Sequence, residues 1–185
     1  MRILAVSGSL RESSFNTSLL RAALEAAPDG VELELWEGIG DLPLYDEDLE
    51  ADAPASVHRL REDWAAADAI LFSTPEYNGS VPGGLKNAID WASRPRLEGV
   101  LRNKPVAVVG ASTGQFGALW AQQDLKRILG IAGARVVGTE IPVARAHERF
   151  DSEGRLLDSE VFEQLRLHLT TLASEAVAVP ERVAA

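Results

Sequence analysis

The sequence contains no cysteine among its 185 residues. A disulfide, a thiolate nucleophile, an iron–sulfur cluster and a cysteine-ligated zinc site are therefore excluded. The same absence excludes the α/β phosphatases and arsenate reductases that carry a cysteine in their phosphate loop. Histidine is scarce too. His58, His147 and His168 lie far apart without H-E-x-x-H spacing, so we expect surface or packing histidines rather than metal ligands.

Basic residues are outnumbered by acidic ones, 18 against 28, which gives a net charge of −10. This balance argues against nucleic acid or an anionic membrane as the main partner, although a local loop can still bind a small anion. No apolar run approaches the length of a membrane span. The amino terminus begins with a strand pattern and shows no signal-peptide pattern. We therefore expect a cytoplasmic protein that binds neither membrane nor nucleic acid.

Strand and helix patterns alternate along the chain. Strands are predicted over residues 3–6, 31–36, 69–73, 105–110 and 135–137. Residue 141 is an alternative end for the last of these strands. Helices are predicted over residues 16–27, 54–67, 83–92, 118–129 and 159–177. Asp158 or Ser159 should cap the last helix. The acid-rich segment 41–52 should form a solvated loop, and residues 180–185 should fray.

This alternation predicts one domain over residues 1–185, a three-layer α/β/α sandwich around a five-stranded parallel sheet. Periodicity does not prove the strand order. We favour the flavodoxin-like order 2-1-3-4-5.

The first predicted βα loop spans residues 7–17. Free N–H groups and a partial positive charge at a helix N-terminus favour a phosphate. Neutral donors and one cation are available there, from Ser9, Arg11, Ser14, Asn16 and Thr17. The G-x-G-x-x-G fingerprint and the Gly-Lys-Ser/Thr of a Walker A loop are both missing. The loop therefore suits a monophosphate better than a di- or triphosphate, and a plain Ser/Asn-capped helix is the alternative.

A second loop, residues 75–84, reads Pro-Glu-Tyr-Asn-Gly-Ser-Val-Pro-Gly-Gly between a strand and a helix. Open α/β sheets bind ligands at this edge. Its glycines allow close backbone approach and Tyr77 offers an aromatic face, which suits a flat aromatic guest. An ordinary βα turn is the alternative. A third, weaker loop at residues 110–117 includes Ser112. In the favoured strand order the three loops follow adjacent strands and meet in one crevice.

Two of these loops carry specific motifs. Gly8-Ser9-Leu10-Arg11, with Ser14 and Asn16, resembles the phosphate loop of the NAD(P)H-dependent FMN reductase family, which includes soluble bacterial quinone and chromate reductases. Pro-Glu-Tyr-Asn at residues 75–78, Pro-Gly at 82–83 and Leu-Lys-Asn-Ala-Ile-Asp-Trp at 85–91 resemble its isoalloxazine loop. Leu-Pro-Leu-Tyr at residues 42–45 resembles a further family segment, so the resemblance covers most of the chain.

The resemblance implies FMN as cofactor and NADPH or NADH as co-substrate. It assigns the FMN phosphate to Ser9, Arg11, Ser14, Asn16 and Thr17. It assigns the ring to Pro75, Glu76, Tyr77, Asn78, Gly79 and Ser112. No catalytic side chain is implied, because the flavin N5 takes hydride and the electrons then pass to a quinone, flavin, azo or oxyanion acceptor by a ping-pong cycle.

Family members are usually homodimers or homotetramers, so the expected partners are small-molecule acceptors and further copies of the chain. Trp120 and Gln123 stand where some tetrameric relatives place a polar interface network, which leaves dimer against tetramer open. Two other functions stay in competition. A flavodoxin-type electron carrier would fit the acidity but not Arg11, and a flavin-binding protein without turnover would show no consumption of NAD(P)H.

Individual side chains also keep alternatives. Glu76 acts through its backbone or helps to seat the nicotinamide, with the backbone role favoured. Lys86 forms a surface ion pair with Asp90 four residues on, which we favour over a catalytic role. No dedicated site for the 2′-phosphate of NADPH is recognisable, although Arg11, Arg94 and Arg96 are nearby charges.

Overall fold

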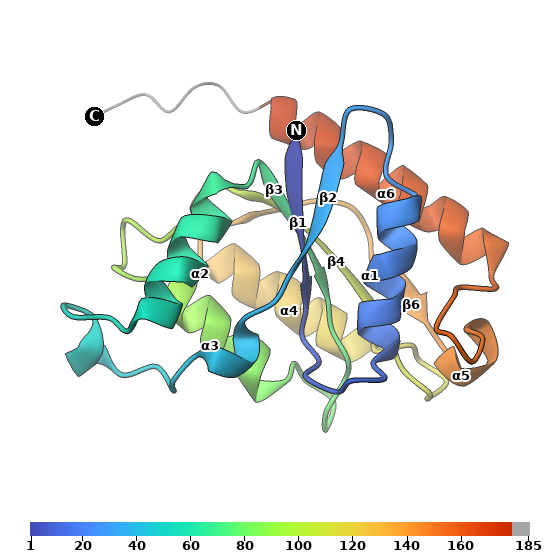
Figure 1. The fold of residues 1–185 in the computed structure, drawn as a ribbon, viewed down its shortest axis with the longest axis horizontal. Helices are drawn as coiled ribbons and strands as arrows, with labels where there is room; N and C mark the ends of the chain where they lie inside the picture. The colour runs from blue at the N-terminus through green and yellow to red at the C-terminus, as the bar shows by residue number, and fades with distance from the viewer. Residues whose placement is uncertain (179–185) are drawn as a thin grey trace.

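A parallel sheet forms the middle layer of the protein in the computed structural model, which describes residues 1–178 (Figure 1). The strands are β1 (Arg2–Ser7), β2 (Glu32–Trp36), β3 (Ala69–Ser73), β4 (Pro105–Ala111), β5 (Arg135–Val136) and β6 (Pro142–Val143). Their order is β2-β1-β3-β4-β5, with β6 also paired to β4. The flavodoxin-like order predicted from the sequence is thus confirmed. Residues 180–185, predicted to fray, lie outside the described residues.

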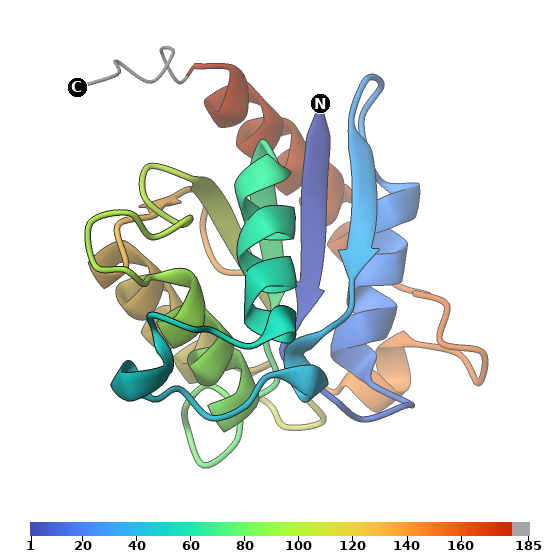
Figure 2. The ribbon, with the colours of Figure 1, turned by 60° about the vertical axis from the view of Figure 1, so that its left-hand side comes forward.

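Helices cover both faces of this sheet, as Figures 1 and 2 show. They are α1 (Phe15–Glu25), α2 (Ala55–Ala66), α3 (Gly83–Ala92), α4 (Leu119–Ile131), α5 (Ala146–Arg149) and α6 (Ser159–Val177). One apolar cluster joins the sheet to α2, α3 and α4, and a second joins it to α1 and α6. Within residues 1–178, no helix combines the length and apolar character needed to cross a membrane.

Burial explains why β3 and β4 read as continuous apolar runs. Both strands lie in the middle of the sheet, and every residue of each is buried, as expected where helices cover both faces. On β1 the side chains alternate, with Leu4 in the α2–α3–α4 cluster and Ile3 in the α1–α6 cluster. Trp64 of α2 fills the first cluster, edge-on to Trp36 at 5.6 Å and to Phe72 at 5.4 Å.

The fifth strand is shorter than predicted, and a sixth follows it. Gly138 has a φ of +74°, which turns the chain away from β4 after Val136. A Cβ atom at Gly138 would lie 2.3 Å from the ring of His168, so only glycine fits there. The chain returns at β6, where the N–H of Gly110 donates to the carbonyl oxygen of Ile141. This break depends on the packing of α6, which local periodicity does not report.

The acid-rich segment is less loosely held than predicted. It contains two 3₁₀ turns, Ile39–Asp41 and Glu47–Leu49, and Tyr45 packs against the core. The N–H of Tyr45 donates to Asn87 Oδ1 at 2.7 Å, and Trp91 Nε1 donates to the carbonyl oxygen of Pro43 at 2.9 Å. Its acidic side chains are mostly exposed, but its backbone is tied to α3 beside the second loop.

Candidate functional site

Three loops lie together at the carboxyl edge of the sheet, at the bottom of the view in Figure 1. They follow β1, β3 and β4, which are neighbours in the sheet with Ser7 opposite Ser73 and Ser73 opposite Val109. The N–H of Gly8 donates to the carbonyl oxygen of Ser73 at 2.8 Å, and the N–H of Thr74 donates to that of Val109 at 3.0 Å. The meeting of the loops predicted from the sequence is thus present in the structure.

The side chain of Asn16 ties the start of α1 to the ends of β3 and β4. Its Nδ2 donates to the carbonyl oxygen of Ala111 at 2.9 Å, and its Oδ1 accepts from the N–H of Ala111 at 3.0 Å and from Ser73 Oγ at 2.9 Å. The side chain is only 3% exposed. Three of its four hydrogen-bonding sites are therefore used inside the protein, so it positions the loops more than it offers donors to a ligand.

The first loop ends in a capped helix. Ser14 is the N-cap of α1, and its Oγ accepts hydrogen bonds from the N–H groups of Asn16 and Thr17. Because both bonds use Ser14 as acceptor, its hydroxyl hydrogen stays available to a ligand oxygen. Thr17 Oγ1 lies 2.9 Å from Ser7 Oγ. α1, eleven residues long, begins at this loop, so the partial positive charge of its N-terminus lies there.

Arg11 supplies the positive charge of the first loop. Its Nη2 donates to the carbonyl oxygen of Ser13 at 2.7 Å, and the guanidinium lies 5.6 Å from the centre of the Phe15 ring. The N–H of Arg11 donates to Ser9 Oγ at 3.3 Å. The exposed guanidinium keeps most of its five N–H donors for a ligand. The donor set of this loop fits a phosphate group.

The second loop contains a tight turn. Asn78 and Gly79 both have positive φ, +53° and +76°, and Tyr77 and Ser80 exchange two backbone hydrogen bonds around them. Positive φ at both central residues is the requirement of a type I′ turn, for which Asn-Gly is the favoured pair. A Cβ atom at Gly79 would meet nothing within 4 Å. Glycine is thus needed here for its backbone conformation, whereas the sequence interpretation invoked close approach to a guest.

Two side chains tie this turn to α4. Glu76 Oε2 accepts a hydrogen bond from the N–H of Ala121 at 3.1 Å, in the first turn of α4. Ser80 Oγ donates to Asp124 Oδ2, and this bond together with the Arg127 guanidinium lowers the pKa of Asp124. The Glu76 side chain therefore has a partner inside the protein, a role that the sequence interpretation did not include.

The third loop is held by β6 and by a buried glutamine. The N–H of Ser112 donates to the carbonyl oxygen of Val143 in β6, and the carbonyl oxygen of Ser112 accepts from the N–H of Ala146 after it. Gln122 is fully buried, and it donates to the carbonyl oxygen of Gly117 at 3.1 Å and accepts from the N–H of Ile141 at 3.0 Å. Sequence reasoning missed Gln122. Its signal was a polar residue on the apolar face of α4, three residues before Leu125.

Other sequence interpretations concern residues away from the loops. Lys86 Nζ lies 2.7 Å from Asp90 Oδ1, which confirms the ion pair. Asp158 caps α6 by accepting from the N–H groups of Glu160 and Val161. His168 is buried, so it is a packing histidine, one of the two predicted kinds. Within residues 1–178 no group of three or more histidine, aspartate or glutamate side chains is arranged to hold a metal ion.

Comparison with known proteins identifies the family of the chain. Residues 1–148 match the family model of NADPH-dependent FMN reductase. The chain belongs to this family. The strand order of this fold explains why the loop at residues 7–17 and the Pro-Glu-Tyr-Asn loop meet at one edge. Membership makes the chain an NAD(P)H-dependent FMN or quinone reductase, with FMN as cofactor and NAD(P)H as co-substrate.

Individual relatives agree with this assignment. The chain is 44% identical over 174 residues to the NAD(P)H-dependent FMN reductase PA1204 of Pseudomonas aeruginosa, covering 93% of each chain. It is 43% identical over 158 residues to a quinone reductase of Pseudomonas putida, covering 84% of each. The solved structure of FerB, a flavoenzyme NAD(P)H:(acceptor) oxidoreductase from Paracoccus denitrificans, superposes with a TM-score of 0.83 at 37% identity, covering 95% of this chain and 97% of FerB.

Proposed function

We propose that this FMN reductase holds FMN across the three loops, takes hydride from NAD(P)H and delivers the electrons to a quinone, flavin, azo or oxyanion acceptor in a ping-pong cycle. The observation that carries the proposal is the Asn16 side chain, which ties the phosphate loop to the ends of β3 and β4. When bound, FMN supplies the hydride and electron transfer. The protein supplies position and electrostatics.

The phosphate end is assigned to the first loop. Arg11 donates charge-assisted hydrogen bonds, while the hydroxyl groups of Ser9, Ser14 and Thr17 donate neutral ones. The positive end of α1 adds to the attraction. Asn16 contributes by holding the loop against β3 and β4, because its side chain is already engaged.

The ring end is assigned to the second and third loops. Pro75 is buried and gives the chain a rigid exit from β3, and Glu76 anchors that exit to α4. Within residues 1–178 the backbone N–H groups of Asn78 and Gly79 have no hydrogen-bond partner, so they are free to stabilise negative charge on the reduced ring. Tyr77, 52% exposed, would shape the substrate face, and Ser112 would line the opposite edge.

Further parts of the proposal extend beyond the site. We expect residues 1–185 to act as one domain, in the cytoplasm, and to form a homodimer or homotetramer. The acceptors are small molecules, in keeping with the quinone reductases among the relatives. Exposed aromatic side chains on α4 and the loop before it, Trp120 and Phe116, offer apolar area beside the ring loop.

An anaerobic visible spectrum tests the function directly. The purified protein is reconstituted with FMN and recorded before and after addition of NADPH or NADH, and again after addition of benzoquinone. Bleaching of the flavin band followed by its return would establish both half-reactions. Bound flavin that neither nucleotide bleaches would favour an electron carrier or a binding protein. A protein that retains no flavin would contradict the three-loop assignment.

A further inference from the structure

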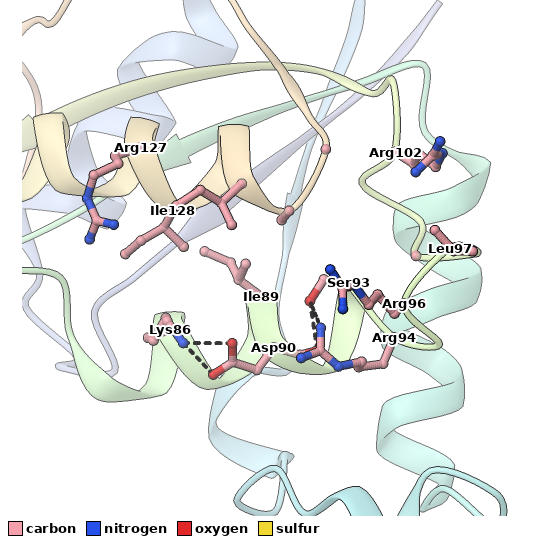
Figure 3. Close-up of a pocket in the computed structure, with 14 residues that line it drawn as sticks. Lys86, Ile89, Asp90, Ser93, Arg94, Arg96, Leu97, Arg102, Arg127 and Ile128 are labelled. Carbon is pink, nitrogen blue, oxygen red and sulfur yellow. Dashed lines mark hydrogen bonds and ion pairs between the residues drawn. The ribbon is translucent and has the colours of Figure 1, made fainter.

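A pocket of about 620 Å³ lies between α3 and α4 (Figure 3). We call it the α3–α4 pocket. Its floor includes Ile89 and Ile128, which face each other in Figure 3. Its charged lining consists of Lys86, Asp90, Arg94, Arg96, Arg102 and Arg127. The volume is within the range of small-molecule sites, and five cations against one carboxylate indicate an anionic ligand.

The cations differ in how far they are neutralised. Lys86 pairs with Asp90 at 2.7 Å, Arg127 with Asp124 at 2.8 Å, and Arg94 with Glu50 at 3.5 Å.

Within residues 1–178 the side chains of Arg96 and Arg102 have neither a hydrogen bond nor an ion pair. Two unpaired guanidinium groups therefore line the same pocket. In a chain whose net charge is −10, this local excess of positive charge stands against the overall field.

The pocket begins close to the proposed flavin ring and leads away from it. Lys86 lies in the first turn of α3, directly after the ring loop, while Arg96 and Arg102 lie past the other end of this helix. Figure 3 shows Lys86 and Arg127 at one end and Arg102 at the other. Because α3 has ten residues, it is about 15 Å long. That length is similar to the distance between the nicotinamide and the adenosine of an extended dinucleotide.

We propose that the α3–α4 pocket binds the adenosine 2′-phosphate end of NADPH, with Arg96 and Arg102 contacting the 2′-phosphate. The inference rests on the proposed function, since the nicotinamide must lie against the flavin ring. Arginine is suited to this task because its planar fork binds phosphate oxygens in pairs. NADH lacks that phosphate, so these two residues would give the enzyme a preference for NADPH.

The test compares a double variant, R96Q/R102Q, with a matched control, R21Q/R166Q. Arg21 lies on α1 and Arg166 on α6, in the opposite layer, so the control removes the same charge away from the pocket. Isothermal titration measures binding of adenosine 2′,5′-bisphosphate, adenosine 5′-phosphate and inorganic phosphate to the FMN-loaded protein. Steady-state kinetics measure KM and kcat for NADPH and NADH.

The double variant should bind adenosine 2′,5′-bisphosphate at least about tenfold more weakly, a loss of about 1.4 kcal/mol or more, and raise the KM for NADPH by a similar factor, because both charge-assisted contacts to the 2′-phosphate are removed. Adenosine 5′-phosphate binding, the KM for NADH and kcat should stay unchanged, and the control should match the parent. Sedimentation should show the same oligomer for both variants.

Three results would overturn the inference. Equal binding of adenosine 2′,5′-bisphosphate by both variants would show that the two arginines do not contact it. If the double variant loses inorganic phosphate binding as strongly as adenosine 2′,5′-bisphosphate binding, the pocket is a general anion site. A smaller oligomer in the double variant alone would show that a second copy covers the pocket. If instead neither nucleotide reduces the flavin of the parent protein, the proposed function fails, an outcome separate from all three.

Discussion

Replacing Asn16 with alanine tests whether one side chain holds the flavin loops together. The change removes three hydrogen bonds of 2.9–3.0 Å, to Ser73 Oγ and to both backbone groups of Ala111. Asn16 is 3% exposed, so water does not readily replace them. The variant leaves the N–H and the carbonyl oxygen of Ala111 without their partner in the interior of the site.

The cost follows from these losses. A net contribution of about 0.5–1.5 kcal/mol for each hydrogen bond, with a larger penalty for a buried group left unpaired, predicts a loss of roughly 2–4 kcal/mol. This is a large share of a typical stability of about 5–15 kcal/mol. FMN affinity should fall as well, because the phosphate loop and the end of β4 are no longer tied to each other.

Urea unfolding of the apoprotein, followed by far-ultraviolet circular dichroism, measures the first effect, and fluorescence titration with FMN measures the second. Asn87→Ala is the matched control. It removes two hydrogen bonds, from Tyr45 and to Pro43, on a partly buried asparagine away from the phosphate loop. It should cost less stability and leave phosphate binding intact.

A second variant separates the two kinds of bond. Asn16→Asp keeps an oxygen that accepts from Ser73 and Ala111, but its second oxygen would face the Ala111 carbonyl oxygen and its charge would be buried beside the phosphate loop, so it should cost at least as much stability as alanine and weaken FMN binding further. The reasoning is refuted if Asn16→Ala costs less than about 1 kcal/mol, below the range expected for three buried bonds, or if FMN binds it as tightly as the parent.

Three further predictions concern charge, backbone and protonation. Arg11→Ala should weaken FMN binding by about tenfold to a hundredfold, because a charge-assisted contact is lost, and should leave the urea midpoint little changed. An unchanged FMN affinity in a fluorescence titration would contradict this prediction. Gly79→Val should lower FMN occupancy, because a β-branched residue is strained at a φ of +76°; full occupancy with normal activity would exclude a role for this turn. His168 has a pKa lowered to about 4, by burial first and then by Lys126, against the opposing effect of Glu140. The unfolded chain takes up this proton near pH 6.5, so the free energy of unfolding should fall by roughly 3 kcal/mol as the pH drops from 6.5 to 4. His168→Leu should flatten that part of the profile of urea midpoint against pH. An unchanged slope would contradict the role given to His168.

Particular residues show how far local patterns reach. The sequence interpretation used Gly79 for close approach to a guest, whereas the structure shows that it serves a tight turn with Asn78, where both residues have positive φ. Lys86 and Asp90 lie one helical turn apart and pair as expected. The contact of the Glu76 side chain was not predicted. That side chain contacts the start of α4, 45 residues away, and nothing in its neighbourhood in the sequence marks that contact.

The sequence by itself determined the alternation of strands and helices and the three loops between them, because these rest on periodicity and turn residues. It favoured the strand order 2-1-3-4-5 without proving it, and the structure confirmed that order. Only the tertiary structure decided that Asn16 joins strand ends 57 and 95 residues away, that the fifth strand breaks at Gly138 against His168, and that arginines from residues 94–127 line one pocket. Contacts between residues far apart in the sequence depend on how the helices pack against the sheet, and local sequence patterns do not report that packing.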